Sequence, residues 1–433
     1  MPVGSATHRK MAVLPTDNSS KHSFRAVVPP PDHPKVKDLD KADVKSYSDP
    51  IVYGPKTGPV FSGWLENLKV PFLGVTVDGT KREGLFELAD ENAPVEETVR
   101  AATRVRQSMS PTELAACSHE IDSDAWRKWS NPELLICTTG LRLENLQQNQ
   151  IELALELLRA SLSADGFKKA TAAMEMNEFL GEITNAKPIL NRHSYQLAFF
   201  GIPSTHKPWG FSLYGHHLCL NIFIVERQMV ISPVFVGAEP NIIDAGPLSG
   251  LTLCSPEEVL GLKLMQTLPP GLQKGAQIYP NLEDEKMPSG RWHPADERHL
   301  CGAFQDNRVV PTEGIKATSM PAQQQELLLK TVETFLVLLP PGPLAARMQQ
   351  IRQRLDETFF SWIGGFGDED PFYYRIQSPV IVVEFDHHRG VFLLNTVPEK
   401  FHIHTVIRTP NGNDYGRELL RQFQARSKAD PNS

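Results

Sequence analysis

The sequence predicts an α+β fold, in which helices pack around a mainly antiparallel sheet within a single large domain. Strand-like runs follow one another in groups, separated by short turns that contain Gly and Pro, and this pattern is typical of antiparallel pairing. Helix-like segments also occur in groups, so the order is helices, sheet, helices, sheet. With 433 residues, of which 40% are hydrophobic, the chain can bury a substantial core.

The first segment, residues 1–48, differs from the rest in composition. It is polar and rich in Pro, Lys and Asp, and it lacks the apolar stretch of a signal peptide. Such a segment buries too little apolar surface to offset the entropy lost on ordering, so we expect a flexible, dispensable arm. The α+β domain is predicted to span residues 49–426, and residues 427–433 are predicted to form a disordered tail.

Helices dominate the first half of the predicted domain. A short strand within residues 71–79 ends at an Asp-Gly turn, and a helical pattern covers residues 94–109. The Ser-Pro pair at 110–111 marks another helix start, because Ser caps helix N-termini and Pro suits the first turn. Residues 143–162 form the clearest amphipathic helix, and a further helix is expected at 167–184.

The middle of the chain changes to strands and loops. Four strands are predicted in succession, at residues 195–201, 210–214, 215–225 and 229–232. Residues 235–255 are rich in Gly and Pro and are predicted to be a loop. Residues 269–323 are predicted to be mainly loop with one helix.

A second group of helices and a second group of strands follow. Helices are expected at 323–339 and 344–360, with a Pro-rich break between them. Three strands are expected at residues 373–377, 380–386 and 401–408, before a helix at the C-terminal end. The sequence shows no internal repeat.

Two histidines interrupt the otherwise apolar run at residues 215–225. If this run is a strand, successive side chains alternate between its two faces. His216 then lies on the apolar face, whereas His217 shares the other face with Asn221. We therefore predict a structural role for His216 and a role in a polar site for His217.

A second pair, His402 and His404, points to one face of the predicted strand at 401–408. Residues two apart along a strand lie about 6.5–7 Å apart on the same side, a separation that one metal ion or one anion can bridge. Arg408 shares this face. The working hypothesis is that His217, His402 and His404 meet in one site.

Glu384 lies among apolar residues inside the predicted strand at 380–386. Burying an unpaired carboxylate is costly, so Glu384 needs a partner, which could be a metal ion, His217 or Arg375. Three histidines and one carboxylate form a common ligand set for zinc, iron or manganese. The predicted metal ligands are therefore His217, Glu384, His402 and His404.

A simpler interpretation stays open for these residues. Histidines in strands are more often hydrogen-bonded core or surface residues than ligands. His402 and His404 could therefore bind a metal, serve other site chemistry or be structural. The run Asp-His-His-Arg at 386–389 is interpreted as an exposed turn outside the site.

Charge, cysteine content and motifs argue against several classes of protein. A net charge of -7 and a pI near 6.1 give no electrostatic basis for binding nucleic acid or an anionic membrane. Five widely spaced cysteines without a C-x-x-C pattern favour a reducing, cytoplasmic environment. No apolar run reaches the roughly 18–20 residues that span a bilayer. The common hydrolase, P-loop, Rossmann and zincin motifs are absent.

Several motifs, taken together, resemble one protein family. They are Trp-Gly-Phe at 209–211, Gly-His-His-Leu at 215–218, Ser-Pro-Val-Phe-Val-Gly-Ala-Glu-Pro at 232–240 and His-Ile-His-Thr-Val-Ile-Arg at 402–408. These motifs are similar to those of the bacterial and fungal family catalogued as domain of unknown function 3500. The resemblance covers residues 60 to 425 and implies one large domain, but it brings no established chemistry.

The expected function is that of a metal-dependent enzyme with a small organic, acidic substrate. A divalent metal ion in the pocket would polarise a substrate oxygen or activate water, with Glu384 beside it, while Arg375 or Arg408 binds an acidic group. Hydrolase- or lyase-like chemistry is favoured. A non-haem iron oxidoreductase and a metal-free anion-binding protein are the alternatives.

Overall fold

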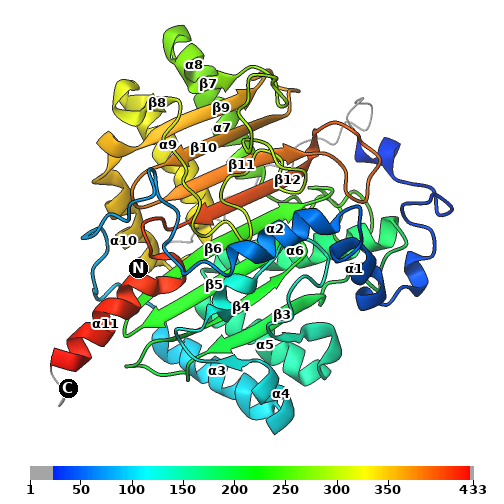
Figure 1. Cartoon of the computed structure of the whole chain (residues 1–433), viewed down its shortest axis with the longest axis vertical. Helices are drawn as coiled ribbons and strands as arrows, with labels where there is room; N and C mark the ends of the chain where they lie inside the picture. Colours follow the sequence, from blue (N-terminus) through cyan, green and yellow to red (C-terminus); the bar gives the residue numbers. More distant parts are fainter. Residues whose placement is uncertain (1–22, 430–433) are drawn as a thin grey trace, which may run out of the picture.

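A twelve-stranded sheet forms the centre of the computed structural model, which describes residues 23–429 (Figure 1). The strands are β1 Ser118–His119, β2 Leu141–Arg142, β3 Tyr195–Phe200, β4 Trp209–Gly215, β5 Leu218–Val225, β6 Gln228–Ala238, β7 Gln277–Tyr279, β8 Ile315–Lys316, β9 Phe359–Gly364, β10 Phe372–Gln377, β11 Val382–His388 and β12 Glu399–Arg408. Their order across the sheet is β1-β3-β4-β5-β6-β12-β11-β10-β9-β7, with β2 paired to β3 and β8 paired to β9.

The sheet is antiparallel everywhere except at its two edges. All neighbours from β3 to β9 pair antiparallel, whereas β1 pairs parallel with β3 and β7 pairs parallel with β9. The prediction of an α+β domain built on a mainly antiparallel sheet is therefore confirmed, with the addition that the sheet is mixed.

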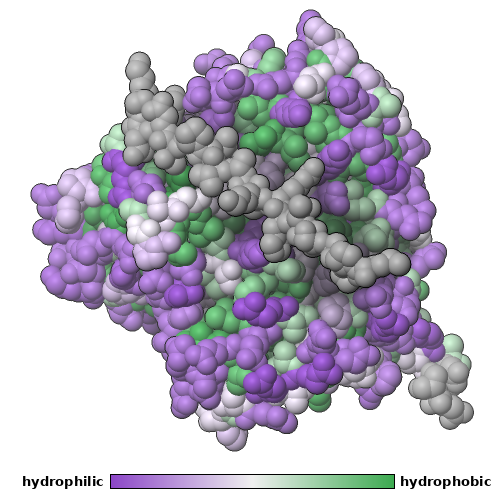
Figure 2. All heavy atoms as spheres, turned by 180° about the vertical axis from the view of Figure 1, so that it is seen from behind, coloured by the Kyte–Doolittle hydropathy of each residue, from purple (hydrophilic) through white to green (hydrophobic). Residues whose placement is uncertain are grey.

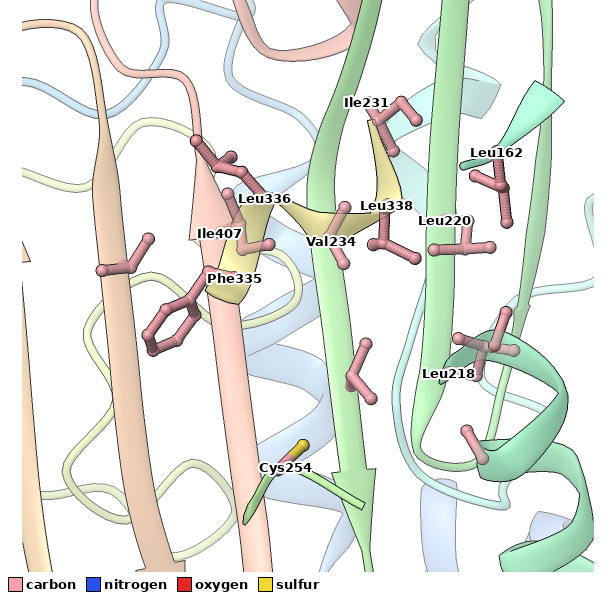
Figure 3. Packing of buried hydrophobic residues seen from close by; sticks show 14 of the residues in the cluster. Leu162, Leu218, Leu220, Ile231, Val234, Cys254, Phe335, Leu336, Leu338 and Ile407 are labelled. Atoms are coloured by element: carbon pink, nitrogen blue, oxygen red, sulfur yellow. The ribbon is translucent and has the colours of Figure 1, made fainter. Parts of the chain in front are cut away.

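Helices cover one face of the sheet, and two helices with long loops cover the other. The first layer contains α3 Val95–Ser108, α5 Gln148–Ser161, α6 Ala164–Ile183, α7 Ser255–Thr267, α9 Ala322–Phe335 and α10 Pro341–Arg352. In Figure 3, the 3-10 turn Leu336–Leu338 after α9 lies over the centre of the sheet, next to Val234 of β6 and Ile407 of β12. The outer side of this layer is mostly hydrophilic, with apolar patches between the polar groups (Figure 2).

The opposite face carries the second, smaller core. The helices α1 Val44–Val52 and α2 Gly58–Asn67 lie on this side, and α2 is visible in front of the sheet in Figure 1. Trp64 of α2 packs with Phe304 from the long segment between β7 and β8. The remaining helices are α4 Pro111–Ala116, α8 Pro270–Ala276 and α11 Arg417–Ala429. None of the helices between residues 23 and 429 combines the length and the apolar character needed to cross a membrane.

The described chain contains the same order of elements twice. Each half has two helices, two short strands, two more helices and then four long strands, running from α3 to β6 and from α7 to β12. In each half the first short strand pairs parallel, and the second antiparallel, with the first long strand. The halves join where β6 pairs antiparallel with β12. The structure thus contains an internal duplication that the sequence did not reveal.

Two glycines support this correspondence at the level of single residues. A Cβ on Gly140, just before β2, would lie 2.3 Å from the carbonyl oxygen of Leu197. A Cβ on Gly314, just before β8, would lie 2.1 Å from the carbonyl oxygen of Phe360. Leu197 and Phe360 are therefore equivalent, and counting through the paired hairpins makes Asn221 of β5 the equivalent of Glu384 of β11.

Several sequence predictions need correction. The residues His216 and His217 form the two-residue turn between β4 and β5, since Gly215 pairs directly with Leu218. The predicted helix at 344–360 ends at Arg352, because the chain there turns into the strand β9, and β6 extends into the predicted loop at 235–255.

The predicted flexible arm is also wrong over its described part. Residues 23–48 contain a 3-10 turn at Phe24–Val27 and the start of α1, and Phe24, Val36 and Leu39 are buried. The Leu394 N–H donates to the Val27 carbonyl at 2.8 Å, which ties this segment to the loop after β11. The other arm residues, 1–22, and the tail residues 430–433 lie outside the described part, whereas 427–429 belong to α11.

Replacing Phe24 by alanine is expected to destabilise the protein by about 3 kcal/mol. Phe24 is buried and its ring lies edge-on to that of Phe179 in α6, with the centroids 6.1 Å apart. Urea denaturation measures the change, and Tyr53→Ala is the matched control because the Tyr53 side chain is exposed. If Phe24→Ala is as stable as Tyr53→Ala, the prediction of a flexible arm would be correct for this segment.

Candidate metal centre

Three histidines from distant parts of the chain converge on the sheet face opposite the main helix layer. His404 Nε2 lies 3.1 Å from His217 Nε2 and 3.0 Å from His402 Nε2. His402 and His404 come from β12, and His217 comes from the turn between β4 and β5. All three side chains are buried. The structure therefore brings together the three histidines that the sequence placed in one site.

The local backbone explains how His217 reaches β12. Its φ of 61° is left-handed, an uncommon conformation for a residue other than Gly, which turns the imidazole toward the sheet face. The His217 N–H donates to the Asn131 carbonyl at 3.1 Å, and its own carbonyl accepts from the Gly237 N–H at 2.8 Å. Gly237 pairs with His404 across β6 and β12, so it links the hairpin turn to the histidine pair.

The protonation of these imidazoles suits a metal ligand set. Burial, followed by the neighbouring imidazoles, lowers the pKa of His217 and His404 well below its usual value. His402 Nδ1 donates to the Arg389 carbonyl at 2.5 Å, so Nε2 is the ring nitrogen that faces His404. The carbonyl thus fixes the orientation of His402, as outer partners of ligating histidines usually do.

Hydrogen bonds alone cannot satisfy both close contacts of His404. His404 Nε2 carries either one proton or a lone pair, so it can make only one of its two close N···N contacts as a hydrogen bond. A cation between the three lone pairs removes this conflict. With metal–nitrogen bonds of about 2.0–2.2 Å at right angles, ligand nitrogens lie about 2.8–3.1 Å apart. The observed separations of 3.0 and 3.1 Å fit that geometry.

A second cluster of potential ligands adjoins the first. His299, His388 and His404 have ligand atoms within 4.8 Å of one another, and so do Glu297, Asp386 and His388. All of these residues are buried. The expectation of an exposed turn at 386–389 is wrong, because Asp386 and His388 lie in β11 and face the histidines of β12.

Little in the amino-acid sequence indicates this second cluster. His299 and Glu297 belong to the irregular segment between β7 and β8, which has no periodic pattern. In Asp386-His387-His388, alternation along a strand would have put residues 386 and 388 on one face. That signal is present in the sequence, but the polar run also fits the exposed turn expected at residues 386–389.

Glu384 does not join the three converging histidines. Its carboxylate accepts hydrogen bonds from Leu300 N at 2.9 Å, Cys301 N at 2.8 Å and the Tyr373 hydroxyl at 2.6 Å. Burial on its own raises the pKa of Glu384, but the neighbouring His299 and Arg375 outweigh burial and hold the pKa well below its usual value. Glu384 therefore anchors the 291–303 segment as an ionised group.

The two predicted substrate-binding arginines differ in their contacts. Arg408 donates to the carbonyls of Cys301 and Gly302 and to the carboxylates of Asp306 and Asp414, so its guanidinium serves the fold. Arg375 uses one nitrogen to contact Pro311 and Glu313, and its Nε and Nη1 have no hydrogen-bond partner within residues 23–429. Arg375, unlike Arg408, therefore has N–H donors left for a ligand.

Gly237→Ala is expected to disturb the histidine cluster directly. A Cβ at this position would lie 3.0 Å from Cδ2 of both His217 and His404 and 2.8 Å from the Ile403 carbonyl oxygen. Such crowding costs about 1–3 kcal/mol, and the displaced rings should bind a metal at least about 10-fold more weakly.

Gly63→Ala in α2 is the control, because a Cβ there meets no atom within 4 Å. Dialysis against Zn²⁺ and thermal melting compare the two variants. Metal binding by Gly237→Ala that equals that of Gly63→Ala would count against this position of the site.

Comparison with known proteins identifies a family but no characterised relative. The family described as protein of unknown function (DUF3500) matches residues 91–417, which contain every residue of both clusters. No curated protein and no solved structure matches the chain. With most of its length matched, the chain belongs to the DUF3500 family.

Proposed function

We propose that this protein is a metal-dependent enzyme in which His217, His402 and His404 hold a divalent cation. The observation that carries the proposal is the convergence of three buried Nε2 atoms, with contacts of 3.0 and 3.1 Å that His404 cannot both satisfy by hydrogen bonding. Three protein ligands leave coordination positions open for substrate, as in catalytic rather than structural metal sites.

The chemistry best supported is hydrolase- or lyase-like conversion of a small organic acid. A divalent cation at this position would act as a Lewis acid, polarising a substrate oxygen or lowering the pKa of a water molecule. Arg375 and Arg291 bind and orient the acidic substrate. Five unpaired cysteines, all in the described part of the chain, favour a cytoplasmic location for this reaction.

Two buried guanidinium groups support an acidic substrate. Arg375 Nη2 lies 2.8 Å, and Arg291 Nη2 lies 3.7 Å, from the same oxygen of Glu313, so the two guanidinium groups share this carboxylate. Arg375 Nε and Nη1 and Arg291 Nε and Nη2 have no hydrogen-bond partner within residues 23–429. Buried donors of this kind need an acceptor, and a carboxylate suits a guanidinium geometrically.

An iron-dependent oxidoreductase is the second candidate. Tetrahedral ligands at bond lengths of about 2.0–2.1 Å lie about 3.3–3.4 Å apart. The shorter separations of 3.0 and 3.1 Å favour a six-coordinate ion such as iron or manganese. A metal-free anion-binding protein is the third, because the arginine pair does not need the cation.

Removal and replacement of the metal distinguish these three functions. The chelator-treated protein is reloaded with Zn²⁺, Mn²⁺ or Fe²⁺ and assayed against a panel of small carboxylic acids and their esters and amides, with oxygen consumption recorded. We expect turnover that is lost on chelation and restored by Mn²⁺ without oxygen uptake.

Each alternative outcome points to a different function. Turnover restored only by Fe²⁺ with oxygen uptake would favour the oxidoreductase. Carboxylate binding, measured by calorimetry, that survives complete removal of metal and occurs without turnover would contradict the enzyme and favour the anion-binding protein.

A further inference from the structure

We infer that a second divalent cation binds beside the first, held by His388 with Asp386 on one side and His299 on the other, so that the site is a two-metal centre. The inference rests on the proposed function, because His404, a ligand of the first cation, also lies beside the second position. Two-metal sites hold their ions about 3.5–4 Å apart and clamp both the attacking and the leaving oxygen of a substrate. The substrate class implied is therefore an ester, amide or phosphate that undergoes hydrolysis.

Unsatisfied polar atoms mark the second position. His388 Nε2 lies 3.1 Å from Asp386 Oδ2, yet it makes no hydrogen bond to any residue within 23–429. Both ring nitrogens of His299 also lack a hydrogen-bond partner in that range, although Nδ1 lies 3.6 Å from Glu384 and the side chain is only 1% exposed. A nitrogen–oxygen separation of 3.1 Å fits two neighbouring ligands of one cation. Buried polar atoms without partners call for an occupant that the protein itself does not supply.

His404 joins the two positions. It belongs to the group with His217 and His402 and also to the group with His299 and His388. The rings of His388 and His404 have centroids 3.8 Å apart, and those of His388 and His402 are 5.6 Å apart. The two ligand sets are therefore neighbours on one face of β11 and β12.

The charges near the second position favour a cation. Arg298 donates from Nε to Asp386 Oδ1 and from Nη2 to Glu297 Oε2, each at 2.7 Å. Two carboxylates lie against this one guanidinium, and Asp386 Oδ2 lies 3.1 Å from His388 Nε2 while it also accepts from the Arg298 backbone N–H at 3.3 Å. Glu384 lies 3.6 Å from His299 Nδ1, and an outer carboxylate beside a ligating histidine is a common arrangement.

The internal duplication shows that the fold does not require these polar groups. Asn221 of β5 is equivalent to Glu384, so the same count along the strands matches Asp386 with Phe223 and His388 with Val225. The first half of the chain thus builds the same hairpin with apolar residues at both positions. The polar pair in the second half is a specialisation of one half, as expected for a functional site.

Stoichiometry of Mn²⁺ binding tests the inference, with metal-free full-length protein dialysed against Mn²⁺ and analysed by mass spectrometry and electron paramagnetic resonance. Wild type should bind two equivalents and show the signal of a coupled Mn²⁺ pair. His388→Gln and His299→Gln should each bind one equivalent with an uncoupled signal. His387→Gln is the control, because His387 is equally buried in β11 but belongs to neither ligand group.

The outcomes separate the second position from the first. If wild type binds one equivalent of Mn²⁺, and His388→Gln and His299→Gln bind the same amount, the second position would be overturned and the first would stand. No Mn²⁺ or Zn²⁺ bound by wild type would overturn both. If His388→Gln does not fold, His299→Gln decides the matter, since His299 lies in an irregular segment rather than in a strand.

Discussion

Replacing His402 and His404 together by alanine is expected to weaken divalent-metal binding by more than about 100-fold. Changes to residues that merely orient a ligand cost up to that factor, and this variant removes two of the three ligands themselves. Turnover should fall to the level of the chelator-treated wild type. Elemental analysis of the purified protein and competition with a fluorescent chelator measure the effect.

Two further variants separate metal loss from misfolding. His217→Asn removes the third imidazole, while Asn tolerates the left-handed φ of 61° at this position. It should bind metal weakly and unfold like wild type. His387→Ala truncates another buried histidine outside the ligand groups and should keep its metal. Metal content near wild type in the double alanine variant would contradict the proposed function.

Replacing Glu384 by alanine is expected to lower the free energy of unfolding by about 3–5 kcal/mol. The change leaves the Leu300 and Cys301 N–H groups and the Tyr373 hydroxyl without their acceptor in a buried region. It also leaves Arg375 with less compensating charge. The 291–303 segment should detach from the sheet, and urea denaturation should show the loss even in metal-free protein.

The pH dependence of the free energy of unfolding provides a second test of this role of Glu384. Because the pKa of Glu384 is lower in the folded than in the unfolded protein, its ionised form stabilises the fold fully above the unfolded pKa of about 4.3. That stability is lost as the pH falls through the folded-state pKa. The difference between wild type and Glu384→Gln should therefore be constant above about pH 5 and shrink below it.

Asn221→Ala is the matched control for Glu384→Ala. Asn221 is the equivalent buried residue in the first half, but its side chain makes one hydrogen bond, from Nδ2 to the Pro233 carbonyl. Its loss should cost about 1–3 kcal/mol. A Glu384→Ala variant no less stable than Asn221→Ala would mean that the carboxylate is not an anchor.

The strands and helices could be predicted where one periodicity dominates. The strands β10 and β12 and the helices α5 and α9 lie close to their expected positions, because their apolar residues repeat with a clear period. The arm could not be judged by composition, since Phe24 and Leu39 are single anchors in a polar segment. The duplication could not be seen either, because the two halves share backbone geometry but few side chains.

The candidate site could be predicted only in part, because only some of its residues lie in segments with a clear period. His402 and His404 share a face through local alternation, which a strand imposes. The alternation that predicts a polar-site role for His217 requires a strand, but His217 reaches the site through a hairpin turn. His299 arrives from a segment without periodicity, and the contacts of Arg408 with Asp306 and Asp414 depend on tertiary structure that no local pattern encodes.

Anomalous X-ray diffraction from crystals grown with Mn²⁺ locates a bound cation without an activity assay. We expect His217, His402 and His404 to hold this cation through their Nε2 atoms. The predicted result is an anomalous peak about 2.0–2.2 Å from all three atoms, on the sheet face opposite the main helix layer. No peak between these histidines at full Mn²⁺ loading, or peaks only elsewhere on the protein, would contradict this coordination.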